Sequence, residues 1–269
     1  MSGGPLMLKS LILWVSFAGA MFFDYSIPDK VLMEEYGRGA KANLITHQNY
    51  VLTSWNVYKG GMEGMHADLA QIINESDFVN LQEFLLDSAQ AQQIQDFDVF
   101  HWVFAKSFKD SDNWTGVTTI SRTEPMEALA LRSADAQPLS NTPKMSLITK
   151  FQIQGGQELW IANMHAINFN VGMGAFERQV DSVINNLRVH TGPLIFTGDF
   201  NTWAPGRYEY LLDKAWELGL TRVELDSPVG FFSVTMDHIF YRGLKDVKGS
   251  VLHQYTTSDH VPLRIEFKL

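Results

Sequence analysis

The chain has no cysteine among its 269 residues. Disulfide bonds, thiolate metal ligands and a cysteine nucleophile are therefore all excluded. There is also no long block of like charge. The net charge of −9 and the pI near 5.3 therefore come from charges spread over an ordinary solvated surface. The sequence shows no basic stripe that would hold a nucleic-acid backbone. This is only mild evidence against a nucleic-acid substrate, because a fold can gather scattered lysines and arginines into one groove.

No apolar run reaches the ~20 residues that a membrane-spanning helix needs. The uncharged stretch SLILWVSFAGAMFF at residues 10–23 follows Lys9 and contains the small residues of a signal-peptide cleavage site at Ala18-Gly19-Ala20. A removed signal peptide over residues 1–20 and a short helix packed on the domain both fit this stretch. The polar segment that follows favours the signal, and with it a periplasmic or secreted protein. A cytoplasmic protein is the alternative.

Beyond residue 45 the pattern is α/β. Short apolar segments rich in β-branched and aromatic residues predict strands at residues 50–55, 78–81, 116–121, 145–153, 159–165, 193–198, 238–242 and 261–267. Amphipathic stretches between some of them predict helices at residues 65–74, 174–190 and 208–219. There is no internal repeat or low-complexity linker. We therefore expect residues 1–44 to be an amino-terminal extension and residues 45–269 to form one domain.

The segment IFTGDFNTW at residues 195–203 begins as a buried strand and then turns polar. Strand side chains alternate, so Asp199 and Asn201 share a face at the point where the strand opens to solvent. Other polar residues also follow apolar segments: Asn56, Glu83, Asn163, His165, Asp237, Asp259 and His260. Each alone has an ordinary explanation as a turn former, a helix cap or a buried structural histidine. Their order along the chain points instead to a catalytic site.

This order resembles that of the endonuclease/exonuclease/phosphatase superfamily, the metal-dependent phosphoesterases that include DNase I, AP endonucleases, inositol-polyphosphate phosphatases and bacterial sphingomyelinases. The most specific motifs are GDFN at residues 198–201 and SDHVP at residues 258–262. The segments WNVYKG, NMHAINF, FYRG and SDHVPLRIEF also look like the bacterial YafD-like branch. The resemblance implies a DNase I-like fold of the α/β (α+β) class, a four-layer sandwich of two packed mixed β-sheets flanked by helices.

Phosphoester hydrolysis needs a cation on the non-bridging oxygens, a positioned water and stabilisation of the leaving oxygen. Glu83 offers a carboxylate oxygen of the type that Mg²⁺ or Mn²⁺ prefers, and Asn56 and Asp259 are candidates to complete the same metal site. The superfamily resemblance supplies the other roles. It implies that Asp199 accepts the proton of the attacking water and that Asn201 holds water or a phosphoryl oxygen.

The same resemblance gives roles to two histidines. His165 and His260 would donate hydrogen bonds to phosphoryl oxygens, and Asp237 would orient His260. Four cations are candidates to hold substrate phosphate, although surface cations are usually only solvated: Lys59, Lys144, Arg207 and Arg242.

Two departures from the wider superfamily bear on the substrate. Tyr58 stands where many AP endonucleases carry an acid or an amide, which disfavours that subclass. The cysteine-containing signature of inositol-polyphosphate phosphatases is absent. We expect a monomeric Mg²⁺- or Mn²⁺-dependent phosphodiesterase without a stable membrane span. Its substrate is a phosphoester, and nucleic acid is one of the candidates. The second hypothesis is a phosphomonoesterase or a phospholipid hydrolase, and the third is a catalytically silent binding module on the same fold.

Overall fold

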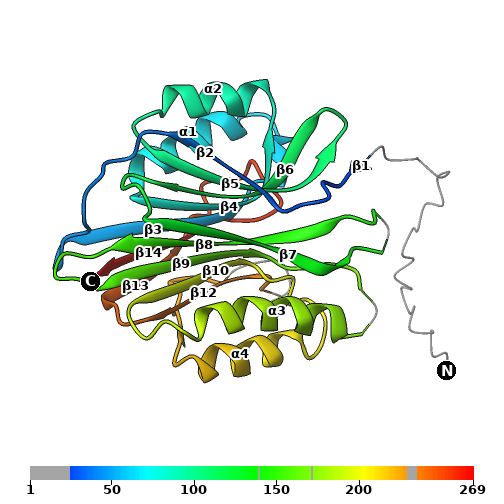
Figure 1. Cartoon of the computed structure of the whole chain (residues 1–269). Coiled ribbons are helices and arrows are strands. Elements are labelled where there is room, and N and C mark those ends of the chain that lie inside the picture. The colour runs from blue at the N-terminus through cyan, green and yellow to red at the C-terminus, as the bar shows by residue number, and fades with distance from the viewer. Residues whose placement is uncertain (1–24, 139, 171, 229–234) are drawn as a thin grey trace, which may run out of the picture.

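Two β-sheets pack face to face at the centre of the molecule, and helices cover both outer faces (Figure 1). The computed structural model describes residues 25–138, 140–170, 172–228 and 235–269. Within them, the first sheet contains eight strands: β1 (Tyr25–Ser26), β2 (Leu32–Gly37), β3 (Asn49–Asn56), β4 (Phe78–Leu86), β5 (His101–Asp110), β6 (Asn113–Ser121), β13 (Lys245–Val251) and β14 (Leu263–Lys268). The second contains six: β7 (Glu127–Ala136), β8 (Pro143–Gln152), β9 (Glu158–His165), β10 (Leu194–Asp199), β11 (Thr221–Arg222) and β12 (Asp237–Arg242).

The outer layers are helical. α1 (Met65–Glu75) and α2 (Ser88–Asp96) lie on the first sheet, and α3 (Gly174–Leu187) and α4 (Arg207–Glu217) lie on the second (Figure 1). The face predicted for α3 is the buried one, since Phe176, Val180 and Leu187 are each fully enclosed. The four-layer, DNase I-like sandwich expected from the sequence is therefore confirmed.

The central strand β10 is buried on both faces. Ile195 packs into the cluster between the two sheets, together with Leu52 and Ile265. Phe196 points the other way and packs in the cluster that contains Phe176 of α3. A strand covered on both faces reads as a continuous apolar run, and each such side chain contributes about 1.5–3 kcal/mol relative to exposure. This anchoring fixes the position at which the strand ends.

The carboxyl ends of four strands meet at one edge of the sandwich. β3 runs parallel to β4, with Asn56 opposite Gln82. β9 runs parallel to β10, with His165 opposite Asp199. β12 is antiparallel to β10, so its first residue, Asp237, also lies opposite Asp199. The topology thus collects the polar strand-end residues in one place.

The folded unit begins earlier than residue 45, the boundary expected from the sequence. β2 pairs with β5 over six residues, and Leu44 is buried in the core between the sheets. The segment LMEEYG of β2 was not recognised because it is an edge strand with two exposed glutamates and no regular apolar alternation. The predicted signal peptide lies outside the described residues. In the described part of the chain, no helix is long and apolar enough to cross a membrane.

Candidate active site

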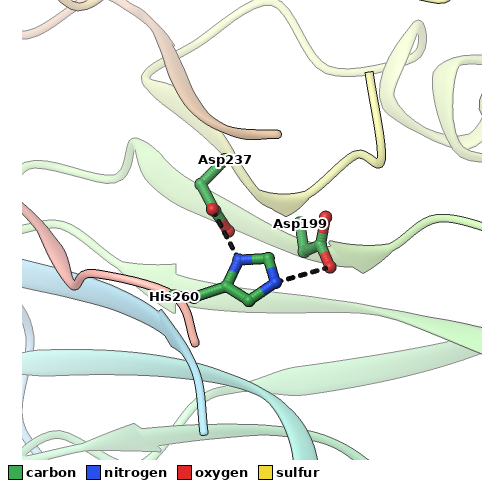
Figure 2. A group of neighbouring side chains, drawn as sticks. All are labelled: Asp199, Asp237 and His260. Atoms are coloured by element: carbon green, nitrogen blue, oxygen red, sulfur yellow. Dashed lines mark hydrogen bonds and ion pairs between the residues drawn. The ribbon is translucent and has the colours of Figure 1, made fainter. Parts of the chain in front are cut away.

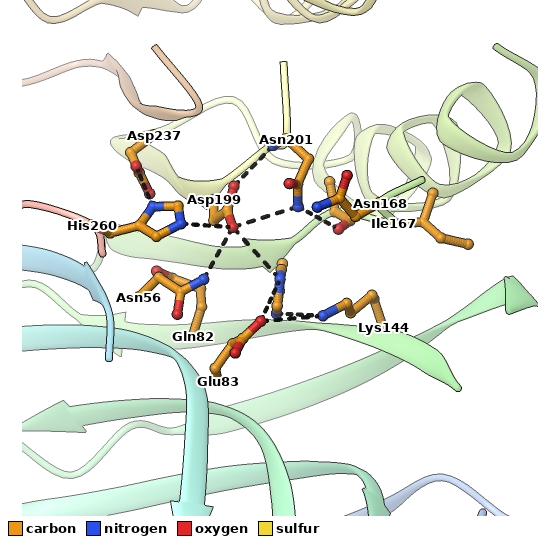
Figure 3. Close-up of polar contacts among 12 residues, drawn as sticks. Asn56, Gln82, Glu83, Lys144, Ile167, Asn168, Asp199, Asn201, Asp237 and His260 are labelled. Carbon is orange, nitrogen blue, oxygen red and sulfur yellow. Dashed lines mark hydrogen bonds and ion pairs between the residues drawn. The ribbon is translucent and has the colours of Figure 1, made fainter. Parts of the chain in front are cut away.

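Asp199, the last residue of β10, is the centre of a polar cluster at this edge (Figure 3). Its Oδ1 accepts a hydrogen bond from the backbone N–H of Asn201 at 2.9 Å, and its Oδ2 accepts one from Asn56 Nδ2 at 3.1 Å. Burial and the neighbouring charge of Asp237 raise the pKa of Asp199 to about 6. A carboxylate in this range accepts a proton from water more readily than an ordinary aspartate.

The backbone on both sides of Asp199 is specialised. Gly198 has φ +145°, and a Cβ at this position would lie 1.9 Å from the carbonyl oxygen of Met164, so only glycine fits beside β9. Asn201 has φ +49°, and its Nδ2 donates to the carbonyl of Ala166 at 2.9 Å. These contacts turn the Asn201 amide back toward Asp199, whose Oδ2 lies 3.4 Å away. The two side chains converge as expected, but through this turn and not through strand alternation, because β10 ends at Asp199.

His260 and Asp237 form a hydrogen-bonded pair beside Asp199 (Figure 2). Asp237 Oδ2 lies 2.7 Å from His260 Nδ1, and His260 Nε2 lies 3.8 Å from Asp199 Oδ2. Burial opposes the charged ring, but the charge and the hydrogen bond of Asp237 raise the pKa of His260 to about 10. The ring therefore carries a proton at neutral pH, and its Nε2–H points toward Asp199.

His165, at the end of β9, is buried in the opposite charge state. Burial and the charge of Lys144 lower its pKa well below the ordinary value. Lys144 Nζ lies 3.5 Å from His165 Nδ1, which makes Nδ1 the acceptor and leaves the proton on Nε2. Nε2 lies 3.6 Å from both Glu83 Oε1 and Asp199 Oδ2. The site thus contains one neutral and one protonated histidine, each with an N–H toward the acidic residues.

Glu83 reaches the site because β4 contains a bulge. The register between β4 and β6 shifts between Leu81 and Phe84, and Glu83 has φ +52°. A bulge breaks the alternation of side chains and re-aims one of them. The Glu83 carboxylate keeps 23% of its surface exposed and lies 3.5 Å from Lys144 Nζ. It is the least enclosed carboxylate among those that contact His165.

Two sets of donors have the chemistry to hold a cation. In the described residues, one atom from each of Asp199, Asp237 and His260 lies within 4.8 Å of the others. This set fits poorly, because Asp237 occupies Nδ1 of a histidine that is protonated, and a protonated ring is not a ligand. We interpret it as a hydrogen-bonded Asp237–His260 pair that forms an ion pair with Asp199.

The second set consists of oxygen donors that face a cleft of about 450 Å³. Glu83, Asn56 and Asp259 all line this cleft, and Asp259 is exposed there. Carboxylate and amide oxygens suit Mg²⁺ or Mn²⁺. The residues predicted as metal ligands therefore line one cleft, and the chemistry of their side chains suits such an ion.

Two of the four predicted phosphate-binding cations are not placed for that role. Arg207 is fully buried, and its Nη1 donates to the carbonyls of Ile167 and Asn201. Arg242 lies at the far end of β12 from Asp237, where its guanidinium donates to three backbone carbonyls. Arg207 thus supports the loop that carries Asn201, and Arg242 ties together loops remote from the site. Sequence alone does not distinguish such buried arginines from solvated ones.

The two lysines lie beside Glu83. Lys144 contacts both Glu83 and His165, as described above. Lys59 is held by an ion pair with Asp110 at 2.6 Å, and it lines a small hollow with Glu83, Lys144 and His165. Neither lysine lines the cleft that contains Asp199.

A model of the endonuclease/exonuclease/phosphatase family matches residues 53–260, a range that contains every candidate residue of the site. The chain belongs to this family. Within it, the UPF0294 protein VP2298 of Vibrio parahaemolyticus is 31% identical over 236 residues, which cover 86% of this chain and 82% of the relative. The UPF0294 protein YE0917 of Yersinia enterocolitica is 32% identical over 219 residues, covering 80% and 82%. These relatives confirm the YafD-like branch predicted from the motifs.

Solved structures of family members share the fold. A family protein from Leptotrichia buccalis aligns with a TM-score of 0.63 at 19% identity, covering 82% of this chain and 100% of that one. Truncated Caenorhabditis elegans TDP2 gives 0.63 at 14% identity, with 83% and 99% covered. The mannosyl-6-phosphatase Bt3783 of Bacteroides thetaiotaomicron gives 0.60 at 18% identity, with 82% and 100% covered.

The endonuclease/exonuclease/phosphatase site also depends on residues that sequence reasoning did not assign. Gln82 Nε2 donates to Asn163 Oδ1 at 2.7 Å, which links β4 of one sheet to β9 of the other. Gln179 of α3 brackets the end of β9, donating to the carbonyl of His165 and accepting from the N–H of Ile167. In the sequence, Gln179 is a polar residue on the apolar face of a predicted helix, and this pattern would have singled it out.

Proposed function

We propose that this protein is a divalent-metal-dependent phosphoesterase that hydrolyses phosphodiesters by attack of water. The observation that carries the proposal is the buried Asp199 carboxylate, held by two amides and flanked by a neutral and a protonated histidine. Family membership supports the reaction class, because the family is one of phosphoester hydrolases.

In this proposal, Asp199 orients the attacking water and accepts its proton. The two N–H groups that face Asp199, from His165 and His260, hold the phosphoryl oxygens and stabilise the charge that develops on them. Asp237 fixes the His260 ring and keeps it charged. Asn56 and Asn201 hold the Asp199 carboxylate in one orientation, so little reorganisation accompanies the reaction.

A divalent cation on the Glu83 side of the cleft would withdraw charge from the phosphoryl group and the leaving oxygen. Glu83, with Asn56 and Asp259, would hold it. The excess of carboxylates in the cleft supports this assignment, since Glu83, Asp199 and Asp259 line it without any lysine or arginine among the described lining residues.

The same charge balance favours a diester over a monoester. A diester carries one negative charge and a monoester up to two, and the cleft offers no side-chain cation beyond the protonated His260. A phosphomonoesterase is the second candidate, because a solved neighbour is a mannosyl-6-phosphatase. Danio rerio TDP2, another neighbour with a TM-score of 0.59 at 17% identity, has been solved with a single-strand DNA product.

The test is a panel of a nucleotide diester, a short DNA, a phosphosugar and a phospholipid, each assayed with Mg²⁺, with Mn²⁺ and with EDTA. We expect diester hydrolysis that EDTA abolishes. Glu83→Gln should weaken Mg²⁺ binding in calorimetry and reduce kcat/KM, because the amide keeps the volume and loses the charge. Glu127→Gln, on the edge strand β7, is the matched control and should change neither. Hydrolysis that persists in EDTA, or no turnover of any phosphoester, would reject the proposal.

A further inference from the structure

Aromatic side chains gather at the mouth of the catalytic cleft. In the described residues four aromatic side chains are exposed, and three of them line this cleft: Tyr58 (48% exposed), Phe169 (59%) and Trp203 (43%). They come from separate loops, which follow β3, β9 and β10. The fourth, Trp216, is on the outer helix α4. Apolar side chains that collect in this way around a polar site mark a ligand-binding surface.

The side chain of Asn168 links the Trp203 ring to the backbone of Phe169. Asn168 Oδ1 accepts hydrogen bonds from Trp203 Nε1 at 2.7 Å and from the N–H of Phe169 at 2.8 Å. The two rings lie 6.3 Å apart with their planes at 42°. The buried Arg207 guanidinium lies 5.5 Å from the Trp203 ring on the protein side. Side-chain contacts therefore hold the Trp203 ring beside the segment that carries Phe169.

The charges of the cleft limit what else the substrate carries. Three carboxylates and no lysine or arginine are found among its described lining residues. The nearest lysines are engaged with carboxylates, Lys59 with Asp110 and Lys144 with Glu83. A phosphate next to the one being hydrolysed would therefore meet no lysine or arginine among the described residues that line the cleft. A long nucleic acid needs such contacts along its backbone.

We propose that the substrate is a small phosphodiester with a single phosphate next to a flat aromatic ring, of the kind a nucleoside provides, and that Phe169 and Trp203 together bind this ring. An acyl chain is a poorer fit, because the exposed groups at the mouth are rings held at fixed angles rather than a continuous aliphatic groove. This inference rests on the proposed phosphoesterase function and specifies its substrate.

Two diesters that differ only in the base test the proposal: the methyl ester of adenosine 5′-phosphate and the methyl ester of ribose 5-phosphate. With Mg²⁺, kcat/KM should be about tenfold or more higher for the adenosine compound, the size expected of one stacked base. Phe169→Leu and Trp203→Leu, which keep apolar bulk without a ring, should bring the ratio close to one. Trp203→Phe should restore much of it. Trp216→Leu, the control at an exposed tryptophan outside the cleft, should leave the ratio unchanged.

Equal kcat/KM for the two esters in the wild-type protein would overturn the inference, as would a preference for octyl methyl phosphate. A twelve-residue oligothymidylate that binds more than tenfold tighter than the mononucleotide ester in 0.15 M salt would overturn the single-phosphate part. Saturation-transfer NMR with uncharged adenosine, and with ribose as its control, needs neither metal nor turnover. If no ester is hydrolysed, the proposed function fails. The aromatic site is then supported if adenosine gives an NMR signal that is lost in Trp203→Leu, and it is rejected if adenosine gives no signal.

Discussion

Asp199 is the residue on which side chains from both sheets converge. Asn56 comes from the first sheet, His165 and Asn201 come from the second, and His260 comes from the segment before β14. A carboxylate held from so many directions has one orientation, and its raised pKa follows from the same enclosure. Position and proton affinity at this residue therefore have a common cause.

The pH dependence of hydrolysis should report Asp199 and His260 together. Asp199 must be ionised and His260 protonated, so kcat/KM should rise as the pH passes about 6 and fall as it passes about 10. In Asp237→Asn both limbs should move to lower pH. In the wild-type protein the negative charge of Asp237 raises the pKa of Asp199 and that of His260, so removing this charge lowers both pKa values. The measurement is kcat/KM from pH 4 to 11. If both limbs of the Asp237→Asn profile stay where they are in the wild-type profile, Asp237 does not set the pKa of either group.

The Asp237–His260 pair should behave as a single unit in kinetics. His260→Ala should reduce kcat/KM by on the order of 10² to 10⁴-fold, because it removes a preorganised donor to the phosphoryl group. Asp237→Asn should account for a sizeable part of that loss, since the ring then loses its fixed orientation and charge. The double variant should be scarcely worse than His260→Ala. Additive losses, or losses that merely follow a lower melting temperature, would indicate a structural role.

The residues of the site were predictable from sequence where they follow strand ends. Side-chain alternation predicted that Asp199 and Asn201 converge, although a turn after β10 brings them together, and the superfamily resemblance connected Asp237 with His260 across 23 positions. The arginines were not predictable, because a guanidinium that serves backbone carbonyls, as Arg207 and Arg242 do, has no local sequence signature. The same holds for Gln82, whose partner Asn163 is 81 residues away.

At the scale of the element, the end of β10 depends on Gly198. A side chain there would overlap the carbonyl of Met164, so β9 and β10 would have to separate at the position where His165 and Asp199 face each other. Gly198→Ala should therefore lower stability and activity together. Gly155→Ala is the matched control, because φ is also positive there but no atom lies within 4 Å. In urea unfolding, the loss for Gly198→Ala should exceed the ~1–2 kcal/mol expected of the backbone conformation alone. Equal losses for the two variants would remove the steric explanation.

Several elements were missed from the sequence for a shared reason. β5 mixes apolar residues with His101, Lys106 and Lys109, β7 reads as an alanine-rich segment, and β13 is mostly polar. α2 carries few apolar residues, and the side chain of Asp87 caps its amino end. Polar or small residues interrupt the apolar pattern in each of these elements. In β13 they are mostly exposed, whereas in β5 eight of ten residues are buried and the polar ones lie among them.

At the scale of the whole molecule, the start of the folded unit can be tested by truncation. A protein that begins at residue 45 lacks β2, which exposes the edge of β5 and removes Leu44 from the core. It should melt about 5–10 °C below a protein that begins at residue 25, and it should scatter more light on heating. Differential scanning fluorimetry with light scattering makes the comparison. Coinciding melting curves would restore the boundary at residue 45.

The hydrogen bond from Asn56 to Asp199 joins the two sheets and spans 143 residues of sequence, and that from Trp55 Nε1 to the His260 carbonyl spans 205. Contacts of such long range are slow to form, because a long stretch of chain must be closed before they can contribute. The proposed hydrolysis, which needs Asp199 held by such contacts, should therefore report completed folding. After dilution from urea, activity should return with the slowest phase, behind far-ultraviolet circular dichroism. A partly folded chain in which Asn56 has not yet reached Asp199 would regain part of its secondary structure and show no activity.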